Sequence, residues 1–343
     1  MKFNKKYTLD IAEKILKIDS PSGFTFHAID FLKKEAERLG YKTSLTQKGN
    51  LIIEVEGKKK EGARGVCAHT DTLGLMVRSI KSDGKLAVTK VGGPIMNTLD
   101  GEYCRIYTRE GKVFTGTILS TSPSIHVYKD AGTLQRDQDT MEIRIDEIVK
   151  SKEDVEKLGI CNGDFIAIDT KTEITKSGFI KSRFLDDKLS VAILFSVLES
   201  MTTNKIVPAK KTYFMITVYE EVGHGGSWIP MDIQELLGVD MGCIGLDLAC
   251  TEYDVSICAK DSSGPYDYEM TNKLIEIAKK EKLSYAVDIY PMYGSDVSTA
   301  LSSSNNIRGA LIGPGVHASH GMERSHIQAV ESSVKLVLEY IKQ

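Results

Sequence analysis

The spacing of hydrophobic and polar positions changes twice along the chain and divides it into three stretches. In the first stretch, apolar residues recur every three or four positions over Leu9–Leu16 and again over Ala28–Leu39, which predicts two helices. Asn50–Glu56 then alternates between apolar and polar residues, and Gly65–His69 is a short apolar run. Both patterns are typical of strands. Up to about Asp71 we therefore expect the order helix, helix, strand, strand, strand.

The second stretch, from about Gly74 to Thr172, consists of short alternating runs separated by turn residues such as Asp83-Gly84 and Asn162-Gly163-Asp164. Only Lys152–Leu158 looks helical within it. Closely spaced short strands of this kind indicate a small all-β module, most simply a barrel. The predicted strands are Val77–Ile80, Lys85–Lys90, Tyr103–Thr108, Lys112–Leu119, Met141–Ile145 and Phe165–Asp169.

In the third stretch helices and strands alternate, which predicts a mixed, largely parallel sheet covered by helices. We therefore expect an α/β domain formed by residues 1–73 and 173–343, interrupted by an inserted small β-barrel domain at residues 74–172. The predicted elements are helices at Lys188–Met201, Asn272–Lys282 and Ala329–Ile341, and strands at Thr212–Tyr219, Gly242–Leu248, Tyr285–Tyr290 and Arg308–Ile312.

Composition narrows the class of protein. The 343 residues are 41% hydrophobic and 27% charged, with a net charge of −3, which favours neither nucleic-acid nor membrane binding. No long apolar run follows the basic start Met1–Lys6, so we expect no membrane span, no secretion signal and a cytoplasmic location. The six cysteines form no C-x-x-C pair, so we expect buried, reduced thiols.

Candidate metal ligands follow the predicted strands. In an α/β sheet, ligands bind beyond the carboxyl ends of the strands. His69 and Asp71 follow the Gly65 strand, and Asp71 can reach back to the second imidazole nitrogen of His69. Asp186 and Asp187 precede the Lys188 helix, where acids also serve as ordinary helix caps.

Three further segments add ligands of the same kind. Glu220 and Glu221 follow an apolar strand, Asp247 lies in the apolar run Leu246–Ala249, and three imidazoles, His317, His320 and His326, lie near the end. Each alone has an ordinary explanation, such as a solvated or salt-bridged side chain. Together at one sheet edge they predict divalent metals, and mixed nitrogen and oxygen ligands favour zinc, cobalt or manganese over magnesium or calcium.

The motifs also resemble a known family. Ala68-His69-Thr70-Asp71, Leu185-Asp186-Asp187-Lys188, Glu220-Glu221-Val222-Gly223, Asp247 and His320 match, in order and spacing, the tetrahedral or glutamyl-type aminopeptidases, which are co-catalytic dinuclear metallopeptidases. The resemblance covers nearly the whole chain. It implies a zinc-aminopeptidase-like fold, an inserted barrel that mediates assembly, short peptide substrates, and a homo-oligomer built from dimers, up to a dodecamer.

The resemblance also implies a role for each residue. Two divalent metal ions are expected per subunit: Asp186 bridges them, His69 and Asp247 complete one site, and Glu221 and His320 complete the other. Glu220 is the expected general base, Asp71 orients His69, and the Asp186–Asp187 peptide is expected to be cis. His317 and His326 remain alternatives to His320, and His224 has no assigned role beyond a structural one.

Other functions fit parts of the pattern. A related two-metal amidohydrolase, either a deacylase or a dipeptidase, would use similar ligands, although the barrel insertion disfavours it. A glycosidase of the endoglucanase type would need only two carboxylates and no metal. A non-enzymatic metal-binding scaffold would not need Glu220. The sequence therefore favours a metallo-aminopeptidase over these three.

Overall fold

The computed structural model describes residues 3–343 and divides the chain into two compact units. The first unit consists of Met1–Asp71 together with Lys171–Gln343, and the second is Thr72–Thr170. Each boundary lies two residues before the predicted one. No helix among the described residues is long and apolar enough to cross a membrane.

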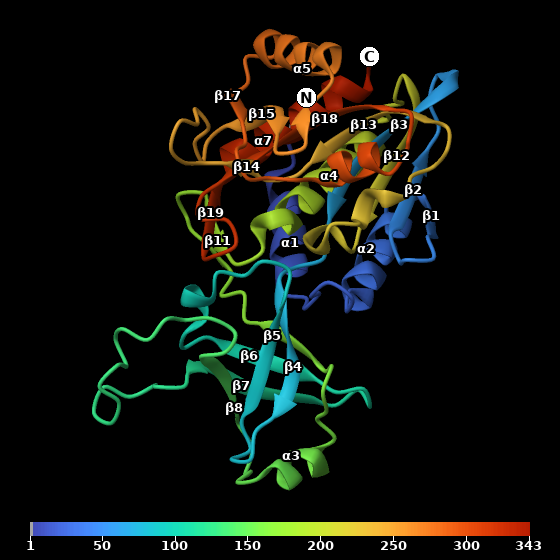
Figure 1. Cartoon of the computed structure of the whole chain (residues 1–343). Coiled ribbons are helices and arrows are strands. Elements are labelled where there is room, and N and C mark those ends of the chain that lie inside the picture. The colour runs from blue at the N-terminus through green and yellow to red at the C-terminus, as the bar shows by residue number, and fades with distance from the viewer. Residues whose placement is uncertain (1–2) are drawn as a thin grey trace. The chain divides into compact units, whose positions relative to one another are not determined.

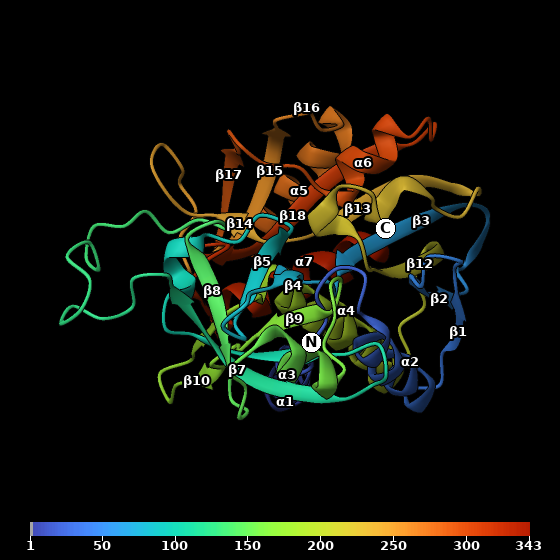
Figure 2. The ribbon, with the colours of Figure 1, turned by 60° about the horizontal axis from the view of Figure 1, so that its bottom comes forward.

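The first unit is built on a 10-stranded mixed sheet. The labelled strands of this sheet can be followed in Figure 2. Two short strands of the sheet do not belong to its main order: β14 (Gly242–Cys243) pairs with β18, and β17 (Tyr285–Ile289) pairs with β15. The main order is β1 (Lys42–Leu45), β2 (Leu51–Val55), β12 (Lys210–Thr217), β3 (Lys59–His69), β13 (Ile233–Val239), β18 (Arg308–Val316), β15 (Val255–Asp261) and β16 (Gly264–Pro265).

Four neighbouring strands at the centre, β12, β3, β13 and β18, are parallel. The carboxyl ends of these strands therefore meet at one edge of the sheet, which is where α/β proteins bind ligands. The strands toward both margins pair antiparallel, except that β17 is parallel to β15. The prediction of a mixed, largely parallel sheet is confirmed.

Six α-helices belong to this unit, and side-chain caps begin several of them. Asn4 caps α1, Asp267 caps α5 and Ser295 caps α6, each by accepting a backbone N–H of the first turn. Figure 1 shows where the helices lie along the chain. They are α1 (Lys5–Leu16), α2 (Phe26–Arg38), α4 (Leu185–Asn204), α5 (Tyr268–Lys280), α6 (Asp296–Ser302) and α7 (Ile327–Ile341).

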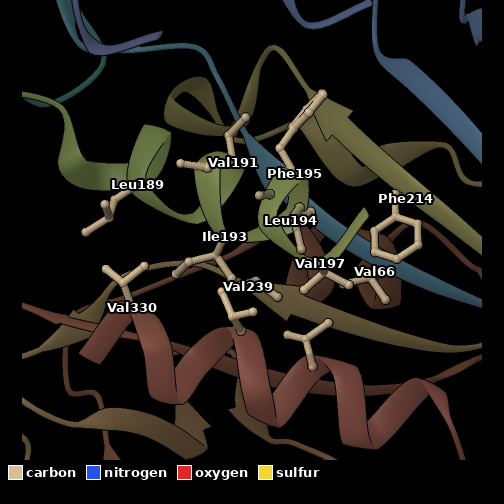
Figure 3. Close-up of a cluster of buried hydrophobic side chains, with 14 of the residues drawn as sticks. Val66, Leu189, Val191, Ile193, Leu194, Phe195, Val197, Phe214, Val239 and Val330 are labelled. Atoms are coloured by element: carbon tan, nitrogen blue, oxygen red, sulfur yellow. The ribbon is translucent and has the colours of Figure 1, made fainter. Parts of the chain in front are cut away.

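Helix α4 is the centre of the core. From residue 185 to residue 198 it is buried on every side, including its polar residues Lys188 and Ser190, whereas α5 buries a single stripe. Figure 3 shows its apolar side chains gathered with Val66 of β3, Val239 of β13 and Val330 of α7. A helix that is apolar all round must lie inside the protein. The residues before its first turn are consequently fixed by the most densely packed part of the unit.

The second unit is a closed barrel in the order β4-β5-β8-β7-β6-β9. Figure 1 labels β4 to β8, and Figure 2 labels β9. All six strands and the helix α3 (Lys152–Leu158) occur where the alternating pattern predicted them. A 3₁₀ turn, η1, covers Met96–Leu99. The strands are β4 (Gly74–Ile80), β5 (Leu86–Val91), β6 (Tyr103–Tyr107), β7 (Val113–Ser120), β8 (Met141–Ile145) and β9 (Phe165–Ile168).

A small antiparallel sheet completes the first unit and had not been predicted. It consists of β10 (Glu173–Ile174), β11 (Phe179–Ser182) and β19 (Glu323–His326). Strand β11 leads directly into α4, and β19 leads directly into α7. The sheet thus ties the segment before α4 to the segment after β18, because Ser182 pairs with Glu323.

Candidate metal centre

The four parallel strands and the start of α4 bring five chain segments to one edge of the sheet. His69 is the last residue of β3, and Asp240 follows β13 directly. Glu220 and Glu221 open the 3₁₀ turn η2 (Glu220–Val222), which follows β12. The remaining residues, Asp186 and His320, come from the first turn of α4 and from the loop between β18 and β19.

Asp186 lies between the two imidazoles of the cluster. Its Oδ1 is 3.2 Å from Nε2 of His69, and its Oδ2 is 3.6 Å from Nε2 of His320. His320 Nε2 is also 3.7 Å from Oε2 of Glu221, and His69 Nε2 is 3.6 Å from Oε2 of Glu220. Ligand atoms of His69, Asp186 and Glu221 all lie within 4.8 Å of one another, which is close enough to surround a single cation.

The other two candidate imidazoles lie outside the cluster. His317 is exposed and forms an isolated bridge with Arg324. His326 caps α7 by accepting the N–H of Gln328, and its other ring nitrogen lies 2.9 Å from the backbone oxygen of Ser177. Of the three histidines, the structure therefore brings only His320 to the acids.

Asp71 ties two of the ligand segments together. Its carboxylate accepts a hydrogen bond from Ser22 Oγ at 2.5 Å and from the backbone N–H groups of Glu220 and Glu221 at 3.1 and 3.3 Å. Nδ1 of His69 lies 3.0 Å from the backbone oxygen of Asp71 and 3.5 Å from its carboxylate. The orientation of His69 is therefore fixed by Asp71 mainly through its backbone, while the carboxylate holds the η2 turn.

The expectation for Asp247 is wrong in position. The predicted strand Gly242–Leu248 ends after Cys243, and Asp247 is exposed in a turn with φ 61°. Because water solvates this carboxylate, the premise that it needs a buried partner fails. Asp240, seven positions earlier, is buried, and its carboxylate lies within 4.8 Å of ligand atoms of His69 and Asp187. Asp240, and not Asp247, is therefore the aspartate that the structure places beside His69.

Asp187 lies beside Asp186 without sharing its contacts. The peptide bond between them is cis, as expected. Asp187 accepts the backbone N–H of His69 at 3.1 Å, so it fixes the end of β3 from behind. Its other oxygen, Oδ1, is buried and has no hydrogen-bond partner among the described residues, and the same holds for Oε1 of Glu221.

The pKa values of the acidic side chains in the cluster are shifted by burial and by repulsion between neighbouring carboxylates. Burial, and then the charge of Asp186, raises the pKa of Asp240 to about 7. Burial also raises the pKa of Glu220 and of Glu221 well above the usual range. Burial disfavours the charged form of His69, but hydrogen bonds to Asp186 and Asp71 outweigh it and raise its pKa.

The charge and the donor atoms of the cluster both bear on metal binding. Buried carboxylates that repel one another and carry unpaired oxygens are destabilising unless a positive charge neutralises them. The imidazole and carboxylate donors found here are those that bind zinc and similar transition metals. The cluster therefore fits divalent cations in both its charge and its donor set.

The glycine-rich turn after Glu221 packs tightly against the start of α6. A Cβ on Gly226 would lie 2.2 Å from the backbone oxygen of Asp296, so only glycine fits there. His224 is exposed and stacks on Tyr219 with ring centroids 4.7 Å apart. Lys48 donates to the backbone oxygen of His224. The structure thus gives His224 a role in holding the turn that follows Glu221.

Comparison with known proteins finds similar proteins that are named as aminopeptidases. The family model described as M42 glutamyl aminopeptidase matches residues 49–336. "Putative aminopeptidase YhfE" of Bacillus subtilis is 45% identical over 336 residues, which are 98% of this chain and 97% of the relative. An aminopeptidase from the archaeon Desulfurococcus kamchatkensis has the same fold, with a TM-score of 0.88, 22% identity and coverage of 99% and 95% of the two chains.

A further solved structure, the TET1 peptidase of Pyrococcus horikoshii, superposes with a TM-score of 0.86 at 23% identity and covers 97% of this chain and 99% of its own. At that identity it supports the fold alone. The family match, in contrast, extends over most of the sequence, and the bacterial relative matches from end to end. The chain is therefore a peptide-bond hydrolase and belongs to the M42 glutamyl aminopeptidase family.

Proposed function

We propose that this protein is a metal-dependent aminopeptidase that removes N-terminal residues from short peptides with two divalent cations per subunit. The observation that carries the proposal is the position of Asp186, whose two carboxylate oxygens face two different imidazoles, His69 and His320. One carboxylate between two nitrogen ligands is the arrangement that a dinuclear site requires.

The proposed ligands are His69, Asp186 and Asp240 for one cation and Asp186, Glu221 and His320 for the other. Zinc is the proposed metal, with cobalt or manganese as substitutes. Two such cations, when bound, would supply Lewis-acid activation of a water molecule and of the scissile carbonyl.

The proposed general base is Glu220. Its carboxylate faces the same cluster, 3.6 Å from His69 Nε2, and burial raises its pKa well above the usual range. A carboxylate with a raised pKa takes a proton from the attacking water more readily and can return it to the leaving amine. Asp71 keeps Glu220 in place through the Glu220 backbone N–H.

The proposed choice of chain ends follows from the nitrogen donor. A free α-amino group, once deprotonated, can offer its lone pair to one of the two cations, whereas the nitrogen of a blocked terminus is an amide and cannot. This preference separates an aminopeptidase from the alternative deacylase, which acts on acylated amines.

The experiment that tests the proposal measures hydrolysis of aminoacyl chromogenic substrates by protein loaded with zinc, cobalt or manganese. An N-acetylated substrate and a chelator-treated sample are run in parallel. We expect cleavage of free-amine substrates only, and its loss with the chelator. Preferred cleavage of the acetylated substrate would indicate the deacylase, and activity that survives complete metal removal would exclude a metallopeptidase.

The general base has its own test. We expect Glu220→Gln to retain both cations and to lose roughly 10²–10⁴-fold in kcat. Glu281→Gln, which alters an exposed carboxylate after α5, is the matched control and is expected to keep full activity. Near-full activity of Glu220→Gln with both cations bound would show that the proton is accepted elsewhere.

We also propose that the protein works as a homo-oligomer built from dimers, up to a dodecamer, in the cytoplasm. The Pyrococcus horikoshii TET1 peptidase assembles into a tetrahedron or a large octahedral shell. The barrel exposes Ile125, Val127 and Ile148, whose burial between subunits would be favourable. All six cysteines are free, as suits a reducing compartment. Light scattering of the purified protein tests the assembly, and a monomer at micromolar concentration would refute it.

A further inference from the structure

Glu323 joins two of the proposed ligand segments through hydrogen bonds to their backbones. Its side chain is 2% exposed, and it begins β19 opposite Ser182 of β11. One carboxylate oxygen, Oε2, accepts the backbone N–H of Asp186 at 3.0 Å. The other, Oε1, accepts the backbone N–H of His320, also at 3.0 Å.

The Asp186 N–H needs an acceptor because it is buried in a segment without helical geometry. Asp186 has φ −75° and ψ 101°, so the regular part of α4 begins only after Asp187. A buried backbone N–H that lacks a partner costs free energy comparable to a lost hydrogen bond. Asp186 and Glu323 are 7% and 2% exposed, so water does not replace this bond readily. Glu323 therefore holds the chain, from a distant part of the sequence, where it enters α4.

The His320 N–H needs an acceptor for a different reason. His320 has φ 64°, a left-handed conformation that costs a non-glycine residue roughly 1–2 kcal/mol. Its side chain is also 37% exposed, so packing alone does not hold it against the cluster. The hydrogen bond to Glu323 is a contact that fixes the backbone in this conformation, with the imidazole directed toward Asp186.

We infer that Glu323 is a positioning residue that sets the separation of Asp186 and His320 before a metal arrives. The inference rests on the proposed function, in which these two residues share a cation. Because one rigid carboxylate accepts both N–H groups, movement of either ligand segment away from the other breaks a hydrogen bond in a buried site. Groups that orient metal ligands in this way typically contribute roughly 10–100-fold to metal affinity or activity.

The experiment compares Glu323→Gln with Glu235→Gln. A glutamine has one carbonyl oxygen, so it can accept only one of the two N–H groups, and its own NH₂ then faces the other. Glu235 is also a buried carboxylate and pairs with Arg64 at 2.8 Å, but it lies five residues before Asp240 on β13, away from the ligands. This control separates loss of positioning from loss of stability.

Metal-free forms of both variants and of the unaltered protein are titrated with zinc and with cobalt, and bound metal is measured by elemental analysis after dialysis. We expect Glu323→Gln to bind the more weakly held cation roughly 10–100-fold less tightly, with kcat restored by excess metal. Glu235→Gln should keep the affinities of the unaltered protein while unfolding at a lower temperature.

The outcomes distinguish the two proposals. If the unaltered protein binds fewer than two cations, the proposed function fails. If it binds two and Glu323→Gln binds both as tightly as the unaltered protein does, the positioning role is wrong and Glu323 only accepts two buried N–H groups. Should Glu323→Gln fail to fold, Glu323→Asp keeps the charge on a side chain one methylene shorter, too short to reach both segments. Metal affinities of Glu323→Asp equal to those of the unaltered protein would then overturn the inference.

Discussion

Asparagine substitution of two acids seven residues apart, Asp240→Asn and Asp247→Asn, separates the site found in the structure from the one expected from the sequence. Both changes keep the shape of the side chain and remove one negative charge. Asp240 is buried with its carboxylate within 4.8 Å of ligand atoms of His69 and Asp187, whereas Asp247 is exposed. Only the first change is expected to affect metal binding.

The magnitude follows from the charge that is lost. Two opposite unit charges about 4 Å apart attract by about 4 kcal/mol at the effective dielectric constant of ~20 that suits protein sites. Zinc carries two charges, so its attraction to the carboxylate is at least this large. Since about 1.4 kcal/mol is a factor of ten in an equilibrium constant, Asp240→Asn should weaken the binding of one cation by roughly a thousandfold or more. Asp247→Asn should change either affinity by less than about threefold, because surrounding water already solvates its charge.

The assay is isothermal titration of the metal-free proteins with zinc at pH 8, where Asp240 is ionised because its pKa is about 7. A second readout is the stability of the metal-free proteins. Asp240→Asn should stabilise the metal-free form, since it removes a carboxylate that burial and Asp186 both disfavour. Two tightly bound cations in Asp240→Asn, or loss of one in Asp247→Asn, would refute this assignment of the ligand.

Three further predictions concern stability and reactivity. In the folded protein the pKa of Asp240 is raised from 3.8 to about 7, so its contribution to the stability of the metal-free protein is complete below about pH 4 and is lost as the pH rises through 7. Urea unfolding of the metal-free protein at a series of pH values should show this fall in stability, and the zinc-loaded protein should not show it. Phe195→Ala, in the fully buried face of α4, should cost about 3–5 kcal/mol of unfolding free energy, and a cost below 1 kcal/mol would contradict the packing. Iodoacetamide at pH 8 should label the exposed Cys161 first and leave Cys104 unmodified until unfolding, because burial raises the pKa of Cys104 to about 12; peptide mass spectrometry checks the order.

The outline of the fold follows from hydrophobic spacing alone. All six barrel strands and the helix Lys152–Leu158 occur where alternation and turn residues predict them. These elements are local, and each buries one face in a pattern that a short window of sequence contains. The parallel strands β3, β12 and β18 were also predicted, because each is a run of apolar residues followed by a polar loop.

Strand β13, one of several strands that the spacing did not predict, explains why the sequence selected Asp247 instead of Asp240. Its sequence, Ile233–Val239, contains Gln234, Glu235 and two leucines, all of which are good helix formers. Tertiary context overrides that preference, since the segment lies between β3 and β18 and pairs with both. Had β13 been recognised, the rule that ligands follow strand ends would have selected Asp240.

The role of Glu323 could not be predicted for a different reason. Its two partners are backbone N–H groups, of Asp186 and His320, and no residue type in the sequence marks a backbone donor as unsatisfied. The small sheet that brings β19 beside β11 consists of strands of two to four residues. Strands this short contain too few positions to show a period.

The burial of α4 from residue 185 to residue 198 determines which motions Asp186 can follow. Backbone amides exchange with solvent hydrogen only when the surrounding structure opens, and elements packed on all sides open with free energies up to that of global unfolding. Asp186 is attached to such an element, whereas His320 lies on a loop and its side chain is partly exposed. We therefore expect the Asp186 carboxylate to keep its position until the unit unfolds, and local opening of the cluster to start at the His320 loop.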